Sequence, residues 1–190
     1  FRVAVLGDTD DGACTVQHCT LREAIMASNA AADRDSILVV TTAPTTLTLG
    51  AALPFLSEDV DLVANGPAQF IVDAAATQAA QRGVLYATNS AVVSVRGMTL
   101  RGGRRNGGGG LVIDDSAVVT MRDVHVRDNE SIGGTAGGVL VLRGGQGTFT
   151  DVEITNNRSS IGGGGMLVDV GSSVSMRRGR IADNESVGGN

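Results

Sequence analysis

The chain has 190 residues, 27 glycines and a formal net charge of −5, and its 15 basic residues are all arginine. Leucine, isoleucine, valine and phenylalanine make up about a quarter of it, more than a disordered segment carries, and no apolar run is long enough to span a membrane. The acidic balance argues against a nucleic-acid binder, which carries a basic stripe. Aromatic residues make up only 3%, so aliphatic residues must fill the core of what we expect to be one domain, 1–190.

Residues 1–34 differ from the rest and are expected to cap the domain. Thr20 and Glu23 have the spacing of a capping box, in which the threonine hydroxyl accepts a hydrogen bond from the first helical turn and the glutamate reaches back. Leu21 and Ile25 then share the apolar face of an amphipathic helix that runs to about Ala31. This is the one helix that we expect.

Acidic residues precede the helix. Asp8, Asp10 and Asp11, followed by Gly12, resemble the first half of a calcium-binding loop, in which oxygen ligands alternate and a glycine makes the turn. Cys19 stands where such a loop carries its bidentate acid. The segment is therefore either a calcium candidate or a plain acidic turn, and we expect no other metal and no cofactor.

Residues 35–83 contain short apolar runs of strand length, separated by turn signals. The runs are Ile37–Val40, Leu47 with Leu49, Val60–Val63 and Phe70–Val72. Prolines at positions 44, 54 and 67 punctuate them. We expect degenerate early coils of the repeat that follows.

Residues 84–190 consist of a repeat of 26–28 residues. Each copy has alternating apolar positions, loses phase at one position such as Asp123, ends in asparagine and leads into a glycine cluster. A unit of this length without a helix is too short for a propeller blade and lacks the leucine-rich pattern. The repeat predicts an all-β fold, a parallel β-helix whose equivalent residues stack about 4.8 Å apart. An antiparallel sandwich is the alternative, although it would not need a constant repeat length.

Stacking of the copies predicts ladders of equivalent residues. Two inward ladders are Val95, Met121, Phe149, Met176 and Leu100, Val126, Ile154, Ile181. An asparagine ladder contains Asn129, Asn157 and Asn184. We place these asparagines at a corner, because asparagine tolerates a left-handed backbone and its amide can bond to the neighbours above and below.

Two outward rows carry arginine. One contains Arg96, Arg122 and Arg177, with Thr150 between the last two, and the other contains Arg101 and Arg127. Such a row suits an anionic glycan held by bidentate contacts. The alternative is a solvated face that pairs with nearby aspartates.

A further row is apolar and contains Leu85, Val112, Leu140 and Leu167. The neighbours of these residues are apolar too, so the pattern does not say which face of the strand is core. The row is either an exposed interface stripe or a surface that a loop covers.

The sequence assembles no catalytic site. His125 and Glu153 share an outward row and could act as acid and base, but a ladder of opposite surface charges explains them as well. Asp114 and Asp115 resemble the paired carboxylates of β-helix glycosidases. Neighbouring strand residues point to opposite faces, so this pair alone cannot flank a glycosidic bond. We therefore name no catalytic residue.

The N-terminal segment carries a family resemblance. Residues 11–14, Asp-Gly-Ala-Cys, and 19–24, Cys-Thr-Leu-Arg-Glu-Ala, resemble the Cys-Ser-Leu-Arg-Glu-Ala cap motif of secreted bacterial right-handed parallel β-helix proteins, with threonine for serine at position 20. The glycine clusters and asparagine corners resemble repeats of polymorphic outer-membrane adhesins. The resemblance implies a right-handed coil and an extracellular or bacterial cell-surface location. It implies no single activity, since these proteins include adhesins, scaffolds and carbohydrate-active enzymes.

Cys14 and Cys19 are the only cysteines. In a secreted chain a close pair of this kind forms a disulfide, which would hold the loop ahead of the helix. Free thiols are one alternative. A metal site that includes His18 is another, although a closed site usually needs four ligands.

These observations predict a non-catalytic structural or adhesive module. Its expected partner is a second copy, in a fibre or surface layer, or a surface glycan. A carbohydrate-active enzyme, lyase or hydrolase, and an anionic-glycan-binding module are the alternatives. The chain stops where the next strand should begin, so we expect an uncapped end that either continues into further coils or pairs with another subunit.

Overall fold

The computed structural model describes residues 1–188, and they form a parallel β-solenoid of about six turns with one short N-terminal helix, α1 (Leu21–Asn29). The largest sheet contains, in spatial order, β1 (Asp35–Val39), β3 (Val60–Ala64), β6 (Val92–Arg101), β9 (Val118–Arg127), β12 (Gln146–Thr155) and β15 (Ser173–Arg177). It is extended by β2 (Thr45–Thr48), β4 (Phe70–Asp73) and β16 (Arg180–Ala182).

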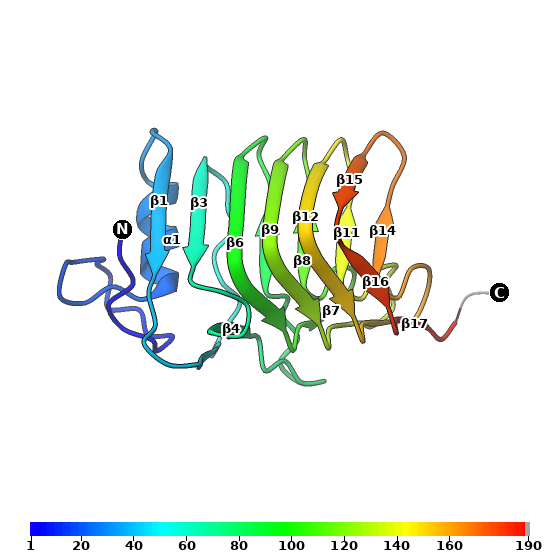
Figure 1. Cartoon of the computed structure of the whole chain (residues 1–190), viewed down its shortest axis with the longest axis horizontal. Coiled ribbons are helices and arrows are strands. Elements are labelled where there is room, and N and C mark those ends of the chain that lie inside the picture. Colours follow the sequence, from blue (N-terminus) through cyan, green and yellow to red (C-terminus); the bar gives the residue numbers. More distant parts are fainter. Residues whose placement is uncertain (189–190) are drawn as a thin grey trace.

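Two narrower sheets complete the later coils. One contains β5 (Leu85–Ala87), β8 (Leu111–Ile113), β11 (Val139–Val141) and β14 (Met166–Val168). The other contains β7 (Arg104–Arg105), β10 (Glu130–Ser131), β13 (Arg158–Ser159) and β17 (Glu185–Ser186). The paired strands run parallel and lie one coil apart in the sequence, so the strands of the largest sheet stand side by side from β1 to β15 (Figure 1).

The register confirms the predicted coil length. Val92, Val118, Gln146 and Ser173 are successive partners in the largest sheet, 26, 28 and 27 residues apart. Both inward ladders form as predicted, since Met121 pairs with Val95 and Phe149, and Val126 pairs with Leu100 and Ile154. The fold is therefore the predicted parallel β-helix and not an antiparallel sandwich.

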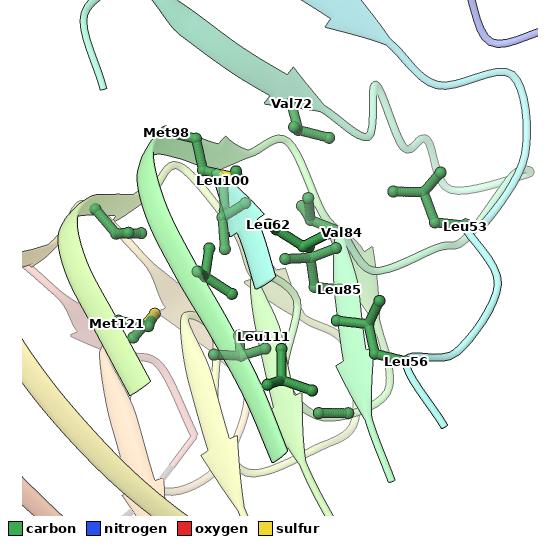
Figure 2. Packing of buried hydrophobic residues seen from close by; sticks show 14 of the residues in the cluster. Leu53, Leu56, Leu62, Val72, Val84, Leu85, Met98, Leu100, Leu111 and Met121 are labelled. Atoms are coloured by element: carbon green, nitrogen blue, oxygen red, sulfur yellow. The ribbon is translucent and has the colours of Figure 1, made fainter. Parts of the chain in front are cut away.

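The core consists of stacked, mostly aliphatic side chains inside the coil. Figure 2 shows part of it, with Leu62, Leu100 and Met121 among the labelled residues. Met121 is fully buried, whereas Ile181, on the last described coil, is 47% exposed. Burial of an aliphatic side chain contributes about 1.5–3 kcal/mol, so the stacked rungs are the main source of stability.

A left-handed residue produces the predicted phase slip within each long strand. Asp123 has a φ of 54°, and Gly97, Asp151 and Arg178 hold the equivalent position in the other coils, also with positive φ. A Cβ at Gly97 would lie 2.3 Å from the carbonyl oxygen of Ala64, so this coil accepts only glycine. The strand bends at this residue, and the alternation of inward-facing side chains resumes one residue later.

The asparagine ladder forms, but its backbone differs from the prediction. The left-handed residues are Asp128, Asn156 and Asp183, each directly before a ladder asparagine, with φ between 54° and 57°. The prediction that the ladder asparagines themselves take this conformation was wrong. The left-handed turn leaves the side chain of the preceding residue outside the coil. It directs the side chain of the ladder asparagine inward, where Asn129 is 1% exposed.

The N-terminal cap is the predicted helix. The Oγ1 atom of Thr20 accepts a hydrogen bond from the backbone N–H of Glu23 at 3.2 Å, and Glu23 Oε2 accepts one from the N–H of Thr20 at 2.8 Å. Leu21 and Ile25 are buried in the same core as the coils. The helix ends at Asn29, two residues early, because the N–H of Ala30 turns to bond within the last turn. It lies at the N-terminal end of the solenoid (Figure 1).

Candidate ligand-binding face

The first arginine row is assembled as predicted on the outer face of the largest sheet. Arg96 pairs in register with Arg122, Arg122 with Thr150, and Thr150 with Arg177. The three arginines are exposed. Because adjacent strands are about 4.8 Å apart, the row runs along the axis of the solenoid.

A second outward row of hydroxyl side chains accompanies it on the same strands. It contains Ser94, Thr120, Thr148 and Ser175. Each lies two residues before a member of the arginine row, which is about 6.6 Å along a strand. We call the two rows together the arginine face. It carries small polar groups and guanidinium groups and no aromatic side chain.

The arginine face differs from the rest of the surface in its charge balance. Most other arginines bind a carboxylate within 4.0 Å: Arg22, Arg34, Arg101, Arg104, Arg127, Arg143, Arg158, Arg178 and Arg180. Among residues 1–188, no carboxylate lies within that distance of Arg96, Arg122 or Arg177. Their charges are therefore available to a ligand.

One acid close to this row already has a partner. Asp151 accepts hydrogen bonds from Nε and Nη2 of Arg178 at 2.8 and 2.9 Å. The hydrogen bond from Arg178 holds the pKa of Asp151 below its ordinary value, and the charge of Arg122 adds to this effect. Arg122 therefore lies near enough to act on Asp151 without pairing with it.

The second arginine row is also aligned, but its charges are neutralised. Arg101 and Arg127 are partners in register. Arg101 binds Asp73 at 2.9 Å and Arg127 binds Asp128 at 2.5 Å. The second row therefore matches the alternative prediction, a solvated face that pairs with nearby aspartates. Asp73 lies one coil before Arg101, and Asp128 directly follows Arg127.

The expected apolar row is wrong at its first member. Leu85 pairs with Leu111 and is buried in the core, whereas Tyr86 is the partner of Val112, followed by Leu140 and Leu167. The glycine turn before β5 is one residue shorter than the register requires. An alignment of apolar residues alone therefore shifts the strand by one residue and places Leu85 on the opposite face.

A loop covers part of this row. A Cβ at Gly108 would lie 2.4 Å from Cγ2 of Val112, and one at Gly107 would lie 3.0 Å from Cδ2 of Leu140. Val112 is accordingly only 2% exposed, although it does not belong to the core cluster. The glycine loop thus covers Val112, while Leu140 and Leu167 stay half-buried, so the row is not a fully exposed interface stripe.

His125 and Glu153 meet as predicted but gather no further catalytic group. Their Nε2 and Oε2 atoms are 4.0 Å apart, beyond hydrogen-bond distance. Thr99, in the same row, donates to the carbonyl of Pro67 at 2.8 Å, and Arg180 binds Asp183 at 2.9 Å. The arrangement fits a ladder of opposite surface charges.

Asp114 has a structural environment that the sequence reading missed. Its carboxylate is fully buried and accepts hydrogen bonds from the hydroxyl of Tyr86, the guanidinium of Arg143 and the N–H of Asp115. Burial, followed by the hydrogen bond to Asp114, raises the pKa of Tyr86. Tyr86 and Arg143 lie 28 and 29 residues from Asp114. This separation is about one coil length, so the repeat length could have identified both partners.

The calcium prediction fails because its acids bind different partners. Asp8 forms a two-point ion pair with Arg22 at 3.0 and 2.8 Å and also accepts from the N–H of Gly50. Asp10 accepts from the N–H of Gly12 at 3.0 Å. Oδ2 of Asp11 lies 3.0 Å from Nδ1 of His18, and the group of possible metal ligands that contains Asp11 includes neither Asp8 nor Asp10. The three carboxylates therefore do not converge on one position.

The disulfide prediction is confirmed, since Cys14 and Cys19 are bonded to each other. The alternative of a metal bound by these cysteines is therefore wrong. The ring closes directly before the first turn of α1 and contains His18.

Comparison with known proteins places the fold. A family model described as the right-handed β-helix region matches residues 70–189, which contain every strand of the arginine face. Searches of the curated proteins and of the solved structures found no match. Within residues 1–188, no helix has the length and apolarity that crossing a membrane requires. Because the match covers more than half of the chain and the strands form parallel coils, the chain belongs to the right-handed β-helix family.

Proposed function

We propose that the chain is a non-catalytic extracellular module of structural and adhesive type, and that it attaches to an acidic surface glycan through the arginine face. The observation that carries this proposal is a set of exposed arginines that no carboxylate of residues 1–188 pairs with, Arg96, Arg122 and Arg177, whereas most of the other arginines are paired.

The stacking of these arginines supports a role in binding. Arg96 and Arg122 are direct partners on neighbouring strands, and like charges in that position destabilise a sheet by a few tenths of a kcal/mol. Thr150 occupies the same row, so the fold accepts a neutral residue there. A bound anion would relieve the repulsion between the arginines. Ligand binding therefore accounts for this row of arginines, whereas fold stability does not.

The geometry favours a polymer with repeated acidic groups. A guanidinium binds carboxylate or sulfate through two parallel hydrogen bonds. Because the row follows the solenoid axis across β6, β9, β12 and β15 (Figure 1), an extended polyanion can contact several arginines at once. The serine and threonine hydroxyls of the neighbouring row offer further hydrogen bonds. Neutral sugars fit less well, since the face has no aromatic ring on which they could stack.

The test compares two triple variants with the same change in net charge. Arg96, Arg122 and Arg177 are replaced by threonine in one, and the control replaces three arginines that already have carboxylate partners, Arg127, Arg158 and Arg180. Binding to immobilised heparin and to polygalacturonate is measured at 20–150 mM salt. Three exposed charge pairs at about 0.5–1 kcal/mol each predict a loss of about 10–100-fold for the first variant.

The control variant should stay within about threefold of the unsubstituted protein. Equal losses in both variants would show general charge attraction and would overturn the proposal, as would the absence of any binding at low salt. The same mixtures are assayed for new reducing ends and for unsaturated products. Turnover that disappears in a His125→Ala variant would replace the adhesive function by an enzymatic one.

A further inference from the structure

Three side chains with metal-binding groups meet at the N-terminal cap, away from the arginine face. They are Asp11, His18 and Glu23, and one ligand atom from each lies within 4.8 Å of the others. Asp11 comes from the loop before the disulfide, His18 from the ring that the disulfide closes, and Glu23 from the first turn of α1. The fold thus brings together ligands that the sequence reading had assigned to separate features.

The distances within this cluster are those of groups that share an ion. Nδ1 of His18 lies 3.0 Å from Oδ2 of Asp11 and 3.6 Å from Oε2 of Glu23. Zinc binds nitrogen and oxygen ligands at about 2.0–2.2 Å, so two ligands at bond angles of about 90–120° lie about 3.0–3.6 Å apart. Both measured distances fall at the limits of this range.

The imidazole nitrogen of this cluster makes no hydrogen bond within residues 1–188. Nδ1 of His18 is a buried atom that lies within ion-pair distance of the two carboxylates but has no hydrogen-bond partner there. The oxygen of Asp11 is close, yet the two groups are not aligned as donor and acceptor. A buried polar atom without a hydrogen bond is unfavourable, and an ion placed between the nitrogen and the two carboxylates would satisfy it.

The remaining ligands are held in place by the cap. Glu23 is 2% exposed, and its two carboxylate oxygens accept hydrogen bonds from the N–H groups of Asp11 and Thr20, each at 2.8 Å. Each oxygen keeps a second lone pair. His18 is fixed by a tight turn in which its carbonyl accepts from the N–H of Thr15 at 2.7 Å. Asp11 and His18 lie at the surface and can make the small side-chain movements that coordination requires.

We propose that Asp11, His18 and Glu23 form a site for a divalent transition-metal ion, with Zn²⁺ as the preferred occupant. One imidazole and two carboxylates suit zinc, whereas calcium prefers an all-oxygen set. Two carboxylates and a neutral imidazole carry a charge that one divalent cation balances. Solvent water completes the coordination, and the ion links the entry loop, the disulfide ring and α1.

The test measures Zn²⁺ binding to the EDTA-treated chain with its disulfide intact, by isothermal titration calorimetry at pH 7. The expected result is one Zn²⁺ per chain with a micromolar or lower Kd. His18→Ala and Asp11→Asn should each weaken binding at least tenfold, and both side chains are exposed enough for the variants to fold. His125→Ala is the matched control, because it removes the other histidine that faces a glutamate, and it should leave the Kd unchanged.

A Co²⁺ titration followed by visible absorption supplies an independent readout. The d–d bands expected for a nitrogen–oxygen site should appear in the unsubstituted chain and be lost in His18→Ala. Equal Zn²⁺ affinity in the unsubstituted chain and in His18→Ala would overturn the proposal. So would an equal loss in His125→Ala, or displacement of Zn²⁺ by millimolar Ca²⁺.

Discussion

Replacing Asn157 by alanine should remove the middle rung of the asparagine ladder. Its Nδ2 donates to the carbonyl of Val126 at 2.9 Å and to Oδ1 of Asn184 at 3.0 Å. Its Oδ1 accepts from the backbone N–H and from Nδ2 of Asn129 at 3.1 and 3.0 Å. Asn157 is 1% exposed, and three of these hydrogen bonds are buried, whereas the bond to Asn184 is partly buried.

The cost follows from the groups that alanine leaves behind. The backbone N–H of Asn129 and one N–H of its amide lose their acceptor, and the carbonyl of Val126 loses a donor. A buried group left without a partner costs about 1–3 kcal/mol. We therefore expect the free energy of unfolding to fall by about 3–5 kcal/mol, a large share of the roughly 5–15 kcal/mol that holds a typical domain folded.

Urea denaturation followed by far-UV circular dichroism measures this loss, and Asn184→Ala is the matched control. Asn184 makes the same contacts toward the preceding coil but is only partly buried, so water can replace its side chain at about 1 kcal/mol. Hydrogen exchange at the amide of Asn129 should accelerate in the first variant only. A loss below 1 kcal/mol for Asn157→Ala, or one no larger than for Asn184→Ala, would show that the buried hydrogen bonds of Asn157 do not determine the cost.

Three further predictions concern packing, the disulfide and pH. Gly138→Ala should lower the free energy of unfolding by more than 2 kcal/mol, because its Cβ would lie 2.4 Å from a backbone carbonyl oxygen of the next coil. Gly7→Ala should be neutral in the same urea assay, because its Cβ would lie 3.8 Å from the nearest atom. Replacing both cysteines by serine should cost about 2 kcal/mol, the low end expected for a small ring, and a melting temperature unchanged by the substitution would contradict this. The hydrogen bond from Arg34 lowers the pKa of Asp61, so the ion pair stabilises the chain above about pH 4 and its contribution is lost as the pH falls through the folded pKa. Asp61→Asn should therefore cost about 0.5–1 kcal/mol at pH 7, and the difference should shrink as the pH falls below about 4; a constant difference across the titration would argue against the pair.

The repeated features could be read from the sequence because they depend on period alone. Met121 and Phe149 share a ladder since both occupy one position of a unit of nearly constant length, and parallel pairing converts that length into vertical neighbours. The capping box of Thr20 and Glu23 was equally predictable, because its contacts are only three residues apart.

Features that depend on the exact path of a turn were not predictable. Leu85 was assigned to the wrong face because one residue of register reverses the direction of every side chain on a strand. The left-handed residue of the asparagine corner was misplaced by one position for a similar reason. The calcium candidate failed because Arg22, which is distant from Asp8 in the sequence, takes that carboxylate.

The parallel coil, its length, the inward ladders and the helical cap could be inferred from the sequence alone, because they follow from local spacing and from repetition. Which charges are free depends on contacts that form only in the folded chain. Arg96 and Arg101 look alike in the sequence, yet Arg101 binds Asp73 and Arg96 binds no carboxylate of residues 1–188. The approach of Asp11, His18 and Glu23 was decided in the same way. An ion pair or a metal site depends on distances of a few ångströms between segments, and those distances exist only after the turns have closed.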